Sequence, residues 1–116
     1  MATHNEVGKT GEALAATWLI QQGFTVLHRN WRFARTEVDI IASKEDILHF
    51  IEVKTRTGNV FGHPEEQVDR RKMENIISAA DEFQETYPTW KRIQFDILSI
   101  NLQRRIEYFF IEDVFL

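Results

Sequence analysis

The segment from 47 to 56, Ile-Leu-His-Phe-Ile-Glu-Val-Lys-Thr-Arg, constrains the fold more than any other part of the chain. Its first half is apolar at nearly every position, which is typical of a β-strand with both faces covered. Side chains alternate between the faces of a strand, so Glu52, Lys54 and Arg56 share one face. Burying a charged group without a partner is costly. The sequence therefore predicts a covered strand that ends in a carboxylate beside an ammonium group.

The composition limits the classes of protein to which the chain can belong. Its 116 residues are 43% hydrophobic and 28% charged, as in an ordinary globular protein, and we expect residues 1–116 to form one domain. The absence of cysteine excludes disulfides, thiolate metal sites and thiol catalysis. There is no signal-peptide core and no apolar run of the roughly 20 residues that cross a bilayer. We therefore expect a soluble, cytoplasmic protein without a membrane partner.

The charge distribution bears on binding to nucleic acids. A net charge of −4 is unfavourable for a protein that coats nucleic acids non-specifically, because such binding depends on neutralising phosphates. A local basic surface is still compatible with this charge. The stretch 28–35 holds three arginines and a histidine, interleaved with two aromatic residues and without an acid. Arg29 and Arg32 are candidate phosphate contacts there, and an ordinary solvated strand and loop is the alternative.

Periodicity and turn signals predict an α/β fold with a central mixed sheet flanked by helices, in the order α-β-β-β-α-β-β. A capping box at residues 3–6 begins a first helix that continues to about Gln22. A second helix is predicted from Pro64 to about Thr86, and this connection permits a parallel pairing of the strands that flank it. The predicted strands are 24–33, 37–43, 47–56, 93–100 and 105–111.

The first helix carries glycines at positions 8 and 11. Each weakens a helix by about 1 kcal/mol relative to alanine, so we expect a close approach to the sheet to compensate. Glu12 lies at the border of the apolar stripe of this helix. From there its side chain can either reach the edge of the sheet or remain solvated.

Alternation also assigns side chains to faces in the first two strands. Val26 and His28 are expected to share a face of the first strand. In the second strand, Asp39 and Ile41 are expected on one face and Val38 on the other. These assignments assume strands without bulges.

The C-terminal segment 106–116 contains four aromatic residues. It is too apolar for an exposed edge strand, because such edges promote pairing with other chains. We therefore expect this segment to be covered, and a homodimer interface is one way to cover it.

A polar turn at 44–46 predicts a hairpin between the second and third strands, and its register decides where Asp39 lies. With 45–46 as the loop, Asp39 faces Glu52 directly; with 44–45 as the loop, it lies one step away on the same face. A three-residue loop or a bulge would separate the two side chains. Directly opposed carboxylates have Cβ atoms about 5 Å apart and repel by roughly 3 kcal/mol at an effective dielectric constant of about 20.

Two arrangements would relieve this repulsion. Lys54 could bridge Asp39 and Glu52 in an ionic cluster, or a divalent cation could lie between the two carboxylates. Together with Glu12 the carboxylates carry −3 and Lys54 carries +1, so the remaining charge matches one Mg²⁺, which prefers oxygen ligands. The four histidines show no i,i+4 zinc spacing. A lysine beside such a site can deprotonate a bound water or offset charge on a phosphate.

Asp39 followed by Glu52-x-Lys54 on a hairpin, after a helix that carries Glu12, resembles the PD-(D/E)xK nuclease superfamily. More narrowly, the chain resembles the YraN-like family of small bacterial proteins over nearly its whole length. The matching segments are Gly8-x-x-Gly11-Glu12, Asn30, 37–41, 50–56, Phe61-Gly62, Lys72 and Phe95-Asp96. The chain departs from the family pattern at Thr36 and Gln94, where glycine and arginine are usual. These departures bear on the start of the second strand and on phosphate contact.

The resemblance implies a restriction endonuclease-like fold, a Mg²⁺ or Mn²⁺ cofactor and DNA or RNA as the partner. Four residues fall on the active-site positions of the superfamily: Glu12, Asp39, Glu52 and Lys54. The three carboxylates would hold the metal, and Lys54 would serve the attacking water. Candidate contacts to phosphates are Arg56, Lys72, Arg29 and Arg32.

Three functions remain open on this evidence. The first is a metal-dependent nuclease that hydrolyses phosphodiester bonds in DNA or RNA, including structured or branched substrates. The second is a non-catalytic nucleic-acid-binding module of the same fold. The third is a structural or adaptor protein, in which Asp39, Glu52 and Lys54 form only an ionic network. The presence of all four residues at the active-site positions favours the nuclease.

Overall fold

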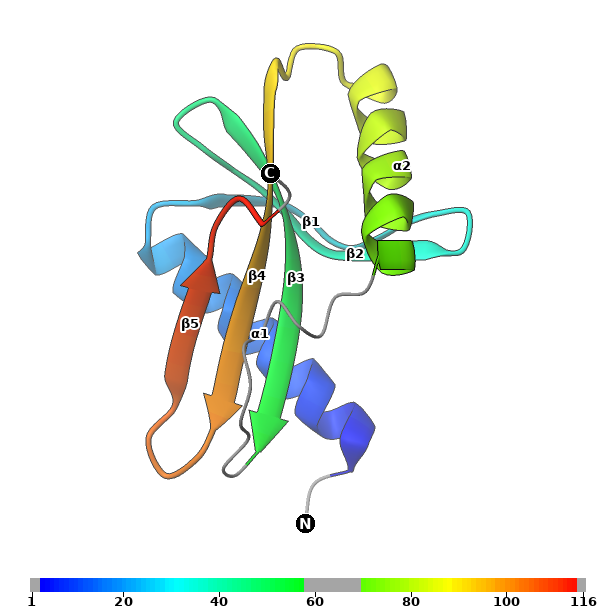
Figure 1. Cartoon of the computed structure of the whole chain (residues 1–116). Coiled ribbons are helices and arrows are strands. Elements are labelled where there is room, and N and C mark those ends of the chain that lie inside the picture. Colours follow the sequence, from blue (N-terminus) through cyan, green and yellow to red (C-terminus); the bar gives the residue numbers. More distant parts are fainter. Residues whose placement is uncertain (1–2, 58–69, 115–116) are drawn as a thin grey trace.

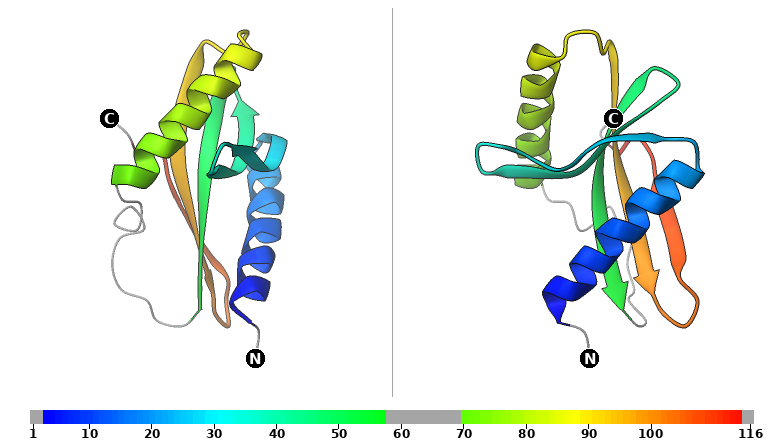
Figure 2. Two further views of the ribbon diagram at one scale, coloured as in Figure 1. Left: turned by 90° about the vertical axis from the view of Figure 1, so that its right-hand side faces the viewer. Right: turned by 180° about the vertical axis from the view of Figure 1, so that it is seen from behind.

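In a computed structural model, which describes residues 3–57 and 70–114, five strands form one sheet with a helix packed on each face (Figures 1 and 2). The elements follow the predicted order: α1 (His4–Gln21), β1 (Thr25–Phe33), β2 (Thr36–Lys44), β3 (Ile47–Thr57), α2 (Arg70–Thr86), β4 (Arg92–Leu102) and β5 (Glu107–Ile111). The predicted helix start at Pro64 and the Phe61-Gly62 motif lie outside the described residues. Neither described helix is both long and apolar enough to cross a membrane.

The capping box and the hairpin turn form as local chemistry dictates. The side chain of Thr3 accepts a hydrogen bond from the backbone of Glu6 (3.2 Å), and the Glu6 carboxylate accepts one from the backbone of Thr3 (2.9 Å). Glu45 and Asp46 both adopt positive φ angles, of 52° and 65°, as a two-residue type I′ hairpin turn requires. The first of the two predicted hairpin registers is therefore the one found, and it pairs Ile40 with Ile51.

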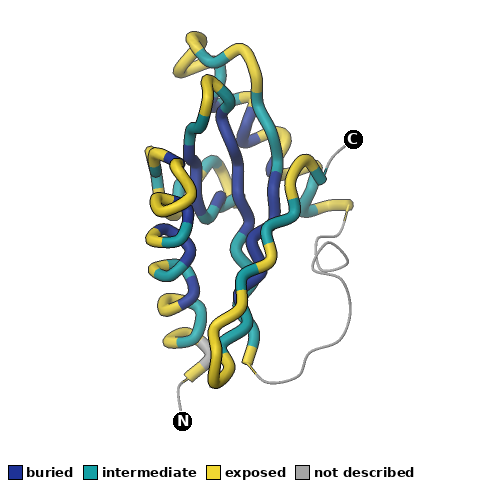
Figure 3. The backbone as a smooth tube through the Cα atoms, turned by 90° about the vertical axis from the view of Figure 1, so that its left-hand side faces the viewer, coloured by how far each residue is buried: buried dark blue, intermediate teal, exposed yellow. Residues whose placement is uncertain are grey.

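The strands lie in sequence order from β1 to β5. The β3–β4 pair is parallel, and the other three pairs are antiparallel. This is the mixed sheet that the sequence predicts, with the long connection through α2 allowing the parallel pair. Most of the buried residues lie in the central strands of the sheet (Figure 3).

Each helix covers its own apolar cluster. On the α1 face the buried residues are Ala15, Ala16, Leu19, Phe24, Ile40, Ala42, Ile51, Leu98 and Ile100. On the α2 face they are Val38, Ile41, Leu48, Phe50, Ile76, Ala79, Ala80 and Phe83. β3 contributes Ile51 to the first cluster and Phe50 to the second, so both of its faces are covered as predicted.

Two face assignments from strict alternation are wrong. The β1–β2 register shifts between Val26 and His28, so Val26 packs in the α1 cluster whereas the ring of His28 contacts Phe83 on α2 (centroids 5.5 Å apart). Val38 packs with Ile41 in the α2 cluster rather than on the opposite face. Val38 lies beyond the point where β2 leaves β3 and the β1–β2 hairpin curves beneath α2 (Figure 1).

The expected cover over the C-terminal strand is found on one face. Trp18 of α1 stacks on Tyr108 (centroids 5.4 Å apart) and meets Phe110 edge-on (5.7 Å). Phe109 points to the other face and is 52% exposed. A homodimer that would cover this second face stays a prediction.

The buried carboxylate of Asp96 on β4 binds both His49 of β3 and the segment after β5. His49 Nδ1 lies 2.6 Å from Oδ2 of Asp96, and both side chains are almost fully buried. The other oxygen of Asp96 accepts hydrogen bonds from the backbone of Asp113 and from Gln94 (both 2.9 Å). The backbone amide of Val114 donates to the carbonyl of Phe95 (2.8 Å). The carboxylate of Asp96 thus serves three donors in the core.

The expected close approach between the first helix and the sheet occurs at one of the two glycines. A Cβ atom at Gly11 would lie 1.8 Å from Oγ1 of Thr55 on β3. A Cβ atom at Gly8 would have no heavy atom within 4 Å. Gly11 therefore lets α1 lie directly on β3, whereas Gly8 has no such packing role.

We predict that Gly11→Ala lowers the free energy of unfolding by about 1–3 kcal/mol, because the added methyl group forces the helix from β3. Gly8→Ala is the matched control, and it should raise the free energy of unfolding by up to about 1 kcal/mol through helix propensity. Urea unfolding monitored by circular dichroism measures both changes. Equal effects at the two positions would contradict the role assigned to Gly11.

Candidate active site

The candidate site lies at the fork where β2 and β3 separate. Pairing between these strands ends at Ile40 and Ile51. Beyond this point β2 pairs with β1 as far as Thr36, while β3 continues beside β4 to Thr57 (Figure 1). The opened edge of β3 begins at Glu52, so the charged end of the strand emerges inside the fork.

Where the backbone hydrogen bonds between β2 and β3 end, a side chain on β2 accepts the next hydrogen bond from β3. The backbone amide of Val53 donates a hydrogen bond to Oδ2 of Asp39 (2.8 Å). This contact satisfies a part-buried N–H group that lies beyond the last residue of β3 paired with β2. It also holds Asp39 on the side of β3 where Glu52 emerges, which is the geometry on which the sequence-based hypothesis depends.

The four residues predicted at active-site positions line one cleft of about 350 Å³. Glu12 comes from α1, Asp39 from β2, and Glu52 and Lys54 from β3. The remaining wall consists of Val7, Gly8, Val53 and Thr55. The fold thus brings together three segments that are far apart in the sequence, while the roles of the four residues stay predictions.

Glu52 is the most enclosed acid of the cleft, with a side chain 8% exposed. Its Oε1 atom lies 3.4 Å from Nζ of Lys54 and also binds Nζ of Lys72, which reaches it from α2. The cleft therefore combines three carboxylates with two ammonium groups, those of Lys54 and Lys72. Its net negative charge is smaller than the charge predicted from the three carboxylates and Lys54 alone. The sequence suggests Lys72 as a phosphate contact and does not predict this ion pair.

The environment of the cleft raises the pKa of two groups, Asp39 and Lys72. Burial, with the charge of Glu52 and more weakly that of Glu12, raises the pKa of Asp39 to about 7, although the Val53 amide and Lys72 act in the opposite direction. Burial tends to lower the pKa of Lys72, but its hydrogen bond and ion pair with Glu52 outweigh this and raise it. Near neutral pH, Asp39 therefore exchanges a proton while Lys72 stays charged.

The donors of the cleft suit a hard divalent cation. The three carboxylates and the carbonyl of Val53 offer oxygen atoms, and none of the described residues that line the cleft is a histidine. Mg²⁺ and Mn²⁺ prefer such ligands. The hydrogen bond from Val53 occupies Oδ2 of Asp39 and leaves Oδ1 as a potential ligand.

Among the described residues, the one group of three acidic or histidine side chains with ligand atoms all within 4.8 Å of one another is His49, Asp96 and Glu112, so the carboxylates of the cleft are less tightly gathered. Asp96 already accepts hydrogen bonds at both oxygens, and one of its partners is His49 itself. A metal would have to break these contacts in the core. We therefore interpret this group as structural.

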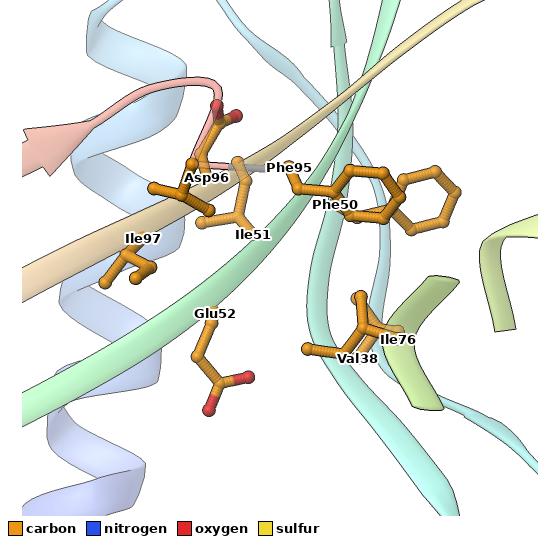
Figure 4. A pocket seen from close by; sticks show the side chains of 9 residues that line it. Val38, Phe50, Ile51, Glu52, Ile76, Phe95, Asp96 and Ile97 are labelled. Carbon is orange, nitrogen blue, oxygen red and sulfur yellow. The ribbon is translucent and has the colours of Figure 1, made fainter. Parts of the chain in front are cut away.

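A small enclosed cavity borders the cleft on the α2 side (Figure 4). Its volume of about 10 Å³ is close to the minimum for one water molecule, so it cannot hold a substrate. Val38, Phe50 and Ile76 line it, and Glu52 lies at its margin. Figure 4 shows the Glu52 carboxylate turned away from these apolar side chains. The stem of Glu52 thus contacts the core while its charge faces the cations.

The other predicted phosphate contacts lie in different settings. Arg29 is exposed on β1. Arg32 is also exposed, but it forms an ion pair across the hairpin with Glu37 (3.4 Å). Glu37 lies just after the stretch 28–35, which itself contains no acid. Arg56 is partly buried on β3, two residues beyond Lys54 on the same face. Contact of these side chains with phosphate stays a prediction.

The two departures from the YraN-like pattern lie outside the cleft lining. Gln94 is half-buried and donates hydrogen bonds to Oδ1 of Asp96 and to Glu112, so it belongs to the hydrogen-bond network beside β5. Thr36 pairs with Phe33 where the β1–β2 turn closes, next to Ala34, whose φ is 55°. Neither residue contacts the proposed metal ligands in the described part of the chain.

Comparison with known proteins places the chain in a family. The family described as "Uncharacterised protein family UPF0102" matches residues 11–100. A UPF0102 protein of Flavobacterium psychrophilum is 40% identical over 99% of this chain and 98% of its own length. UPF0102 proteins of Bacteroides thetaiotaomicron (42% identical; 86% of this chain, 83% of the relative) and Dictyoglomus thermophilum (46%; 87% and 86%) are also similar. The chain therefore belongs to the UPF0102 family, which is the YraN family that its motifs predict.

Proposed function

We propose that this protein is a Mg²⁺- or Mn²⁺-dependent nuclease that hydrolyses phosphodiester bonds of DNA or RNA in the cytoplasm. The observation that carries this proposal is the convergence of Glu12, Asp39, Glu52 and Lys54 on one cleft. A hairpin with no function beyond stability has little reason to hold two carboxylates together at a cost in repulsion. The proposal goes beyond family membership, because the family is described as uncharacterised.

The carboxylates supply the binding half of the site. Asp39 and Glu52 would hold the cation, helped by the carbonyl of Val53, and Glu12 would complete the set of ligands. A bound cation would activate a water molecule and neutralise charge on the scissile phosphate. The hydrogen bond from Val53 fixes Asp39 before any ligand arrives, which reduces the reorganisation that binding requires.

The two lysines have different tasks in this proposal. Lys54 follows Glu52 on the same face of β3 and is 21% exposed, so its ammonium group can reach a substrate in the cleft. It would orient the attacking water or take its proton, and it would offset charge on the phosphate. Lys72 neutralises Glu52. A cation on Glu52 would compete with Lys72 and release it toward the phosphate, in keeping with its predicted contact.

One observation favours the structural alternative. Lys54 and Lys72 both pair with Glu52, so much of the charge in the cleft is balanced by side chains alone. A protein that uses this cluster only as an ionic network would bind no divalent cation there. Metal titration therefore separates the two functions directly.

We predict that Lys54→Ala lowers metal-dependent cleavage by at least about 100-fold, since it removes the group that serves the attacking water. The measurement is a panel of single-stranded, duplex and branched DNA and RNA, each with Mg²⁺ and with Mn²⁺. Lys91→Ala removes the same charge outside the cleft and should cleave like the wild type. Circular dichroism checks that both variants are folded, and unchanged cleavage by Lys54→Ala would eliminate this mechanism.

Asp39 should make stability depend on pH. The folded protein binds the Asp39 proton more tightly than the unfolded chain does, so stability falls as pH rises from about 4 through 7, by a few kcal/mol at most. Urea unfolding with a chelator at pH 5 and pH 8 measures this fall, which Asp39→Asn should reduce.

Because cation and proton compete for Asp39, Mn²⁺ affinity should rise through pH 7. A pH-independent affinity would count against Asp39 as a ligand.

Lys72→Gln should increase the affinity for Mn²⁺ roughly tenfold, equivalent to about 1.4 kcal/mol, because Glu52 loses a competing cation. Isothermal titration calorimetry on the substrate-free protein measures this change independently of activity. Lys91→Gln is the matched control and should leave the affinity unchanged. Weaker Mn²⁺ binding by Lys72→Gln would show that Lys72 supports the site rather than competing for it.

A further inference from the structure

A second hollow, of about 400 Å³, lies between the β1–β2 turn and α2. The turn contributes Phe33, Ala34, Arg35 and Thr36, and α2 contributes Arg71, Asn75 and Ser78. Arg71, Asn75 and Ser78 follow the i, i+4, i+7 spacing and so form one polar stripe along the helix. None of the seven lining residues is acidic. We call this hollow the turn groove.

The two arginines of the turn groove differ in their contacts from Arg32, Lys54 and Lys72, which all form ion pairs. Arg35 and Arg71 are both exposed, and among the described residues neither guanidinium has a hydrogen-bond or ion-pair partner. Arg32, in contrast, pairs with Glu37, and Lys54 pairs with Glu52. The turn groove therefore presents two positive charges that no carboxylate in the described part of the chain balances.

The turn groove and the active-site cleft lie next to each other along the same two elements. On α2, Arg71 lines the groove and the following residue, Lys72, binds Glu52. On β2, Thr36 lines the groove and Asp39 lines the cleft, three residues further along. Three residues of a strand span about 10 Å. The start of α2 and the β1–β2 turn lie side by side in Figures 1 and 2.

We propose that the turn groove binds the phosphodiester backbone of a nucleic acid strand next to the segment that lies in the cleft. This inference rests on the function proposed for the cleft. A guanidinium group can form two parallel hydrogen bonds to a phosphate, and serine, threonine and asparagine also commonly contact phosphates. At an axial rise of 3.4 Å per nucleotide, 10 Å corresponds to about three nucleotides of one strand.

The chemistry of the turn groove also predicts how it contributes to recognition. Contacts to phosphates fix the register of a nucleic acid on a protein without reading its sequence. The groove is therefore a positioning surface that holds the strand while the cleft acts on it. It would allow a protein of net charge −4 to bind nucleic acid, because positive charge without a carboxylate partner would lie beside the cleft that receives the strand.

The test compares two double variants that lose the same charge. R35A/R71A removes both arginines of the turn groove, and R104A/R105A removes two exposed arginines between β4 and β5. The dissociation constant for fluorescently labelled DNA and RNA oligonucleotides is measured with a chelator between 50 and 200 mM KCl. All four arginines are exposed, and thermal unfolding checks that both variants fold.

For R35A/R71A we expect at least tenfold weaker binding and a smaller dependence of log K on log[salt], by about 1.4 to 1.8 in slope for two lost phosphate contacts. R104A/R105A should keep most of the affinity and slope of the wild type. An unchanged slope in R35A/R71A, an equal loss in both variants, or no binding by the wild type would each overturn the proposal.

The same comparison separates this inference from the proposed function. If the wild type binds oligonucleotides through Arg35 and Arg71 but cleaves none, the turn groove stands and the nuclease function fails. If the wild type cleaves and R35A/R71A binds as well as the wild type, the nuclease function stands and the turn groove fails. An acidic peptide that competes equally well with oligonucleotides for the wild type would assign the groove to a protein partner instead.

Discussion

The hydrogen bond from the backbone of Val53 to Asp39 holds the candidate site together. At this point β2 leaves β3, and a part-buried amide without a partner would cost about 1–3 kcal/mol. Asp39 satisfies that amide with its side chain, which places its carboxylate beside Glu52 in spite of their repulsion. The fork in the sheet therefore creates both the space for a cleft and the reason for an acid to occupy it.

Charge balance is the second constraint on the site. Two lysines bind Glu52, and the raised pKa of Asp39 lets this carboxyl group hold a proton, so the cluster is stabilised when no cation is bound. In the function proposed here, a divalent cation would replace the proton and compete with Lys72, so that an ionic network and a metal site would be two states of the same residues. The sequence alone suggested a choice between these two arrangements. The position of Lys72 explains how one set of side chains can serve both.

Local patterns were enough to predict much of this architecture. The polar turn predicts the hairpin and leaves two registers open, of which the structure has the one with Glu45 and Asp46 as the loop, and the period of two in β3 assigns its faces. His28 and Val38 were misassigned because a bulge and the separation of two strands depend on tertiary packing, which alternation ignores. The partner of Lys72 depends on how α2 docks against the sheet, and no sequence spacing between positions 52 and 72 specifies that contact.

The packing of α1 connects the core to the chemistry. Gly11 allows the helix to lie on Thr55, the residue after Lys54, and the next residue of the helix, Glu12, then lines the cleft. A side chain at position 11 would move the helix outward and draw Glu12 away from Asp39 and Glu52. The roughly 1 kcal/mol of helix stability that a glycine costs is thus offset by the contact that positions an acid. A substitution at Gly11 should therefore disturb both the stability of the protein and the geometry of the cleft.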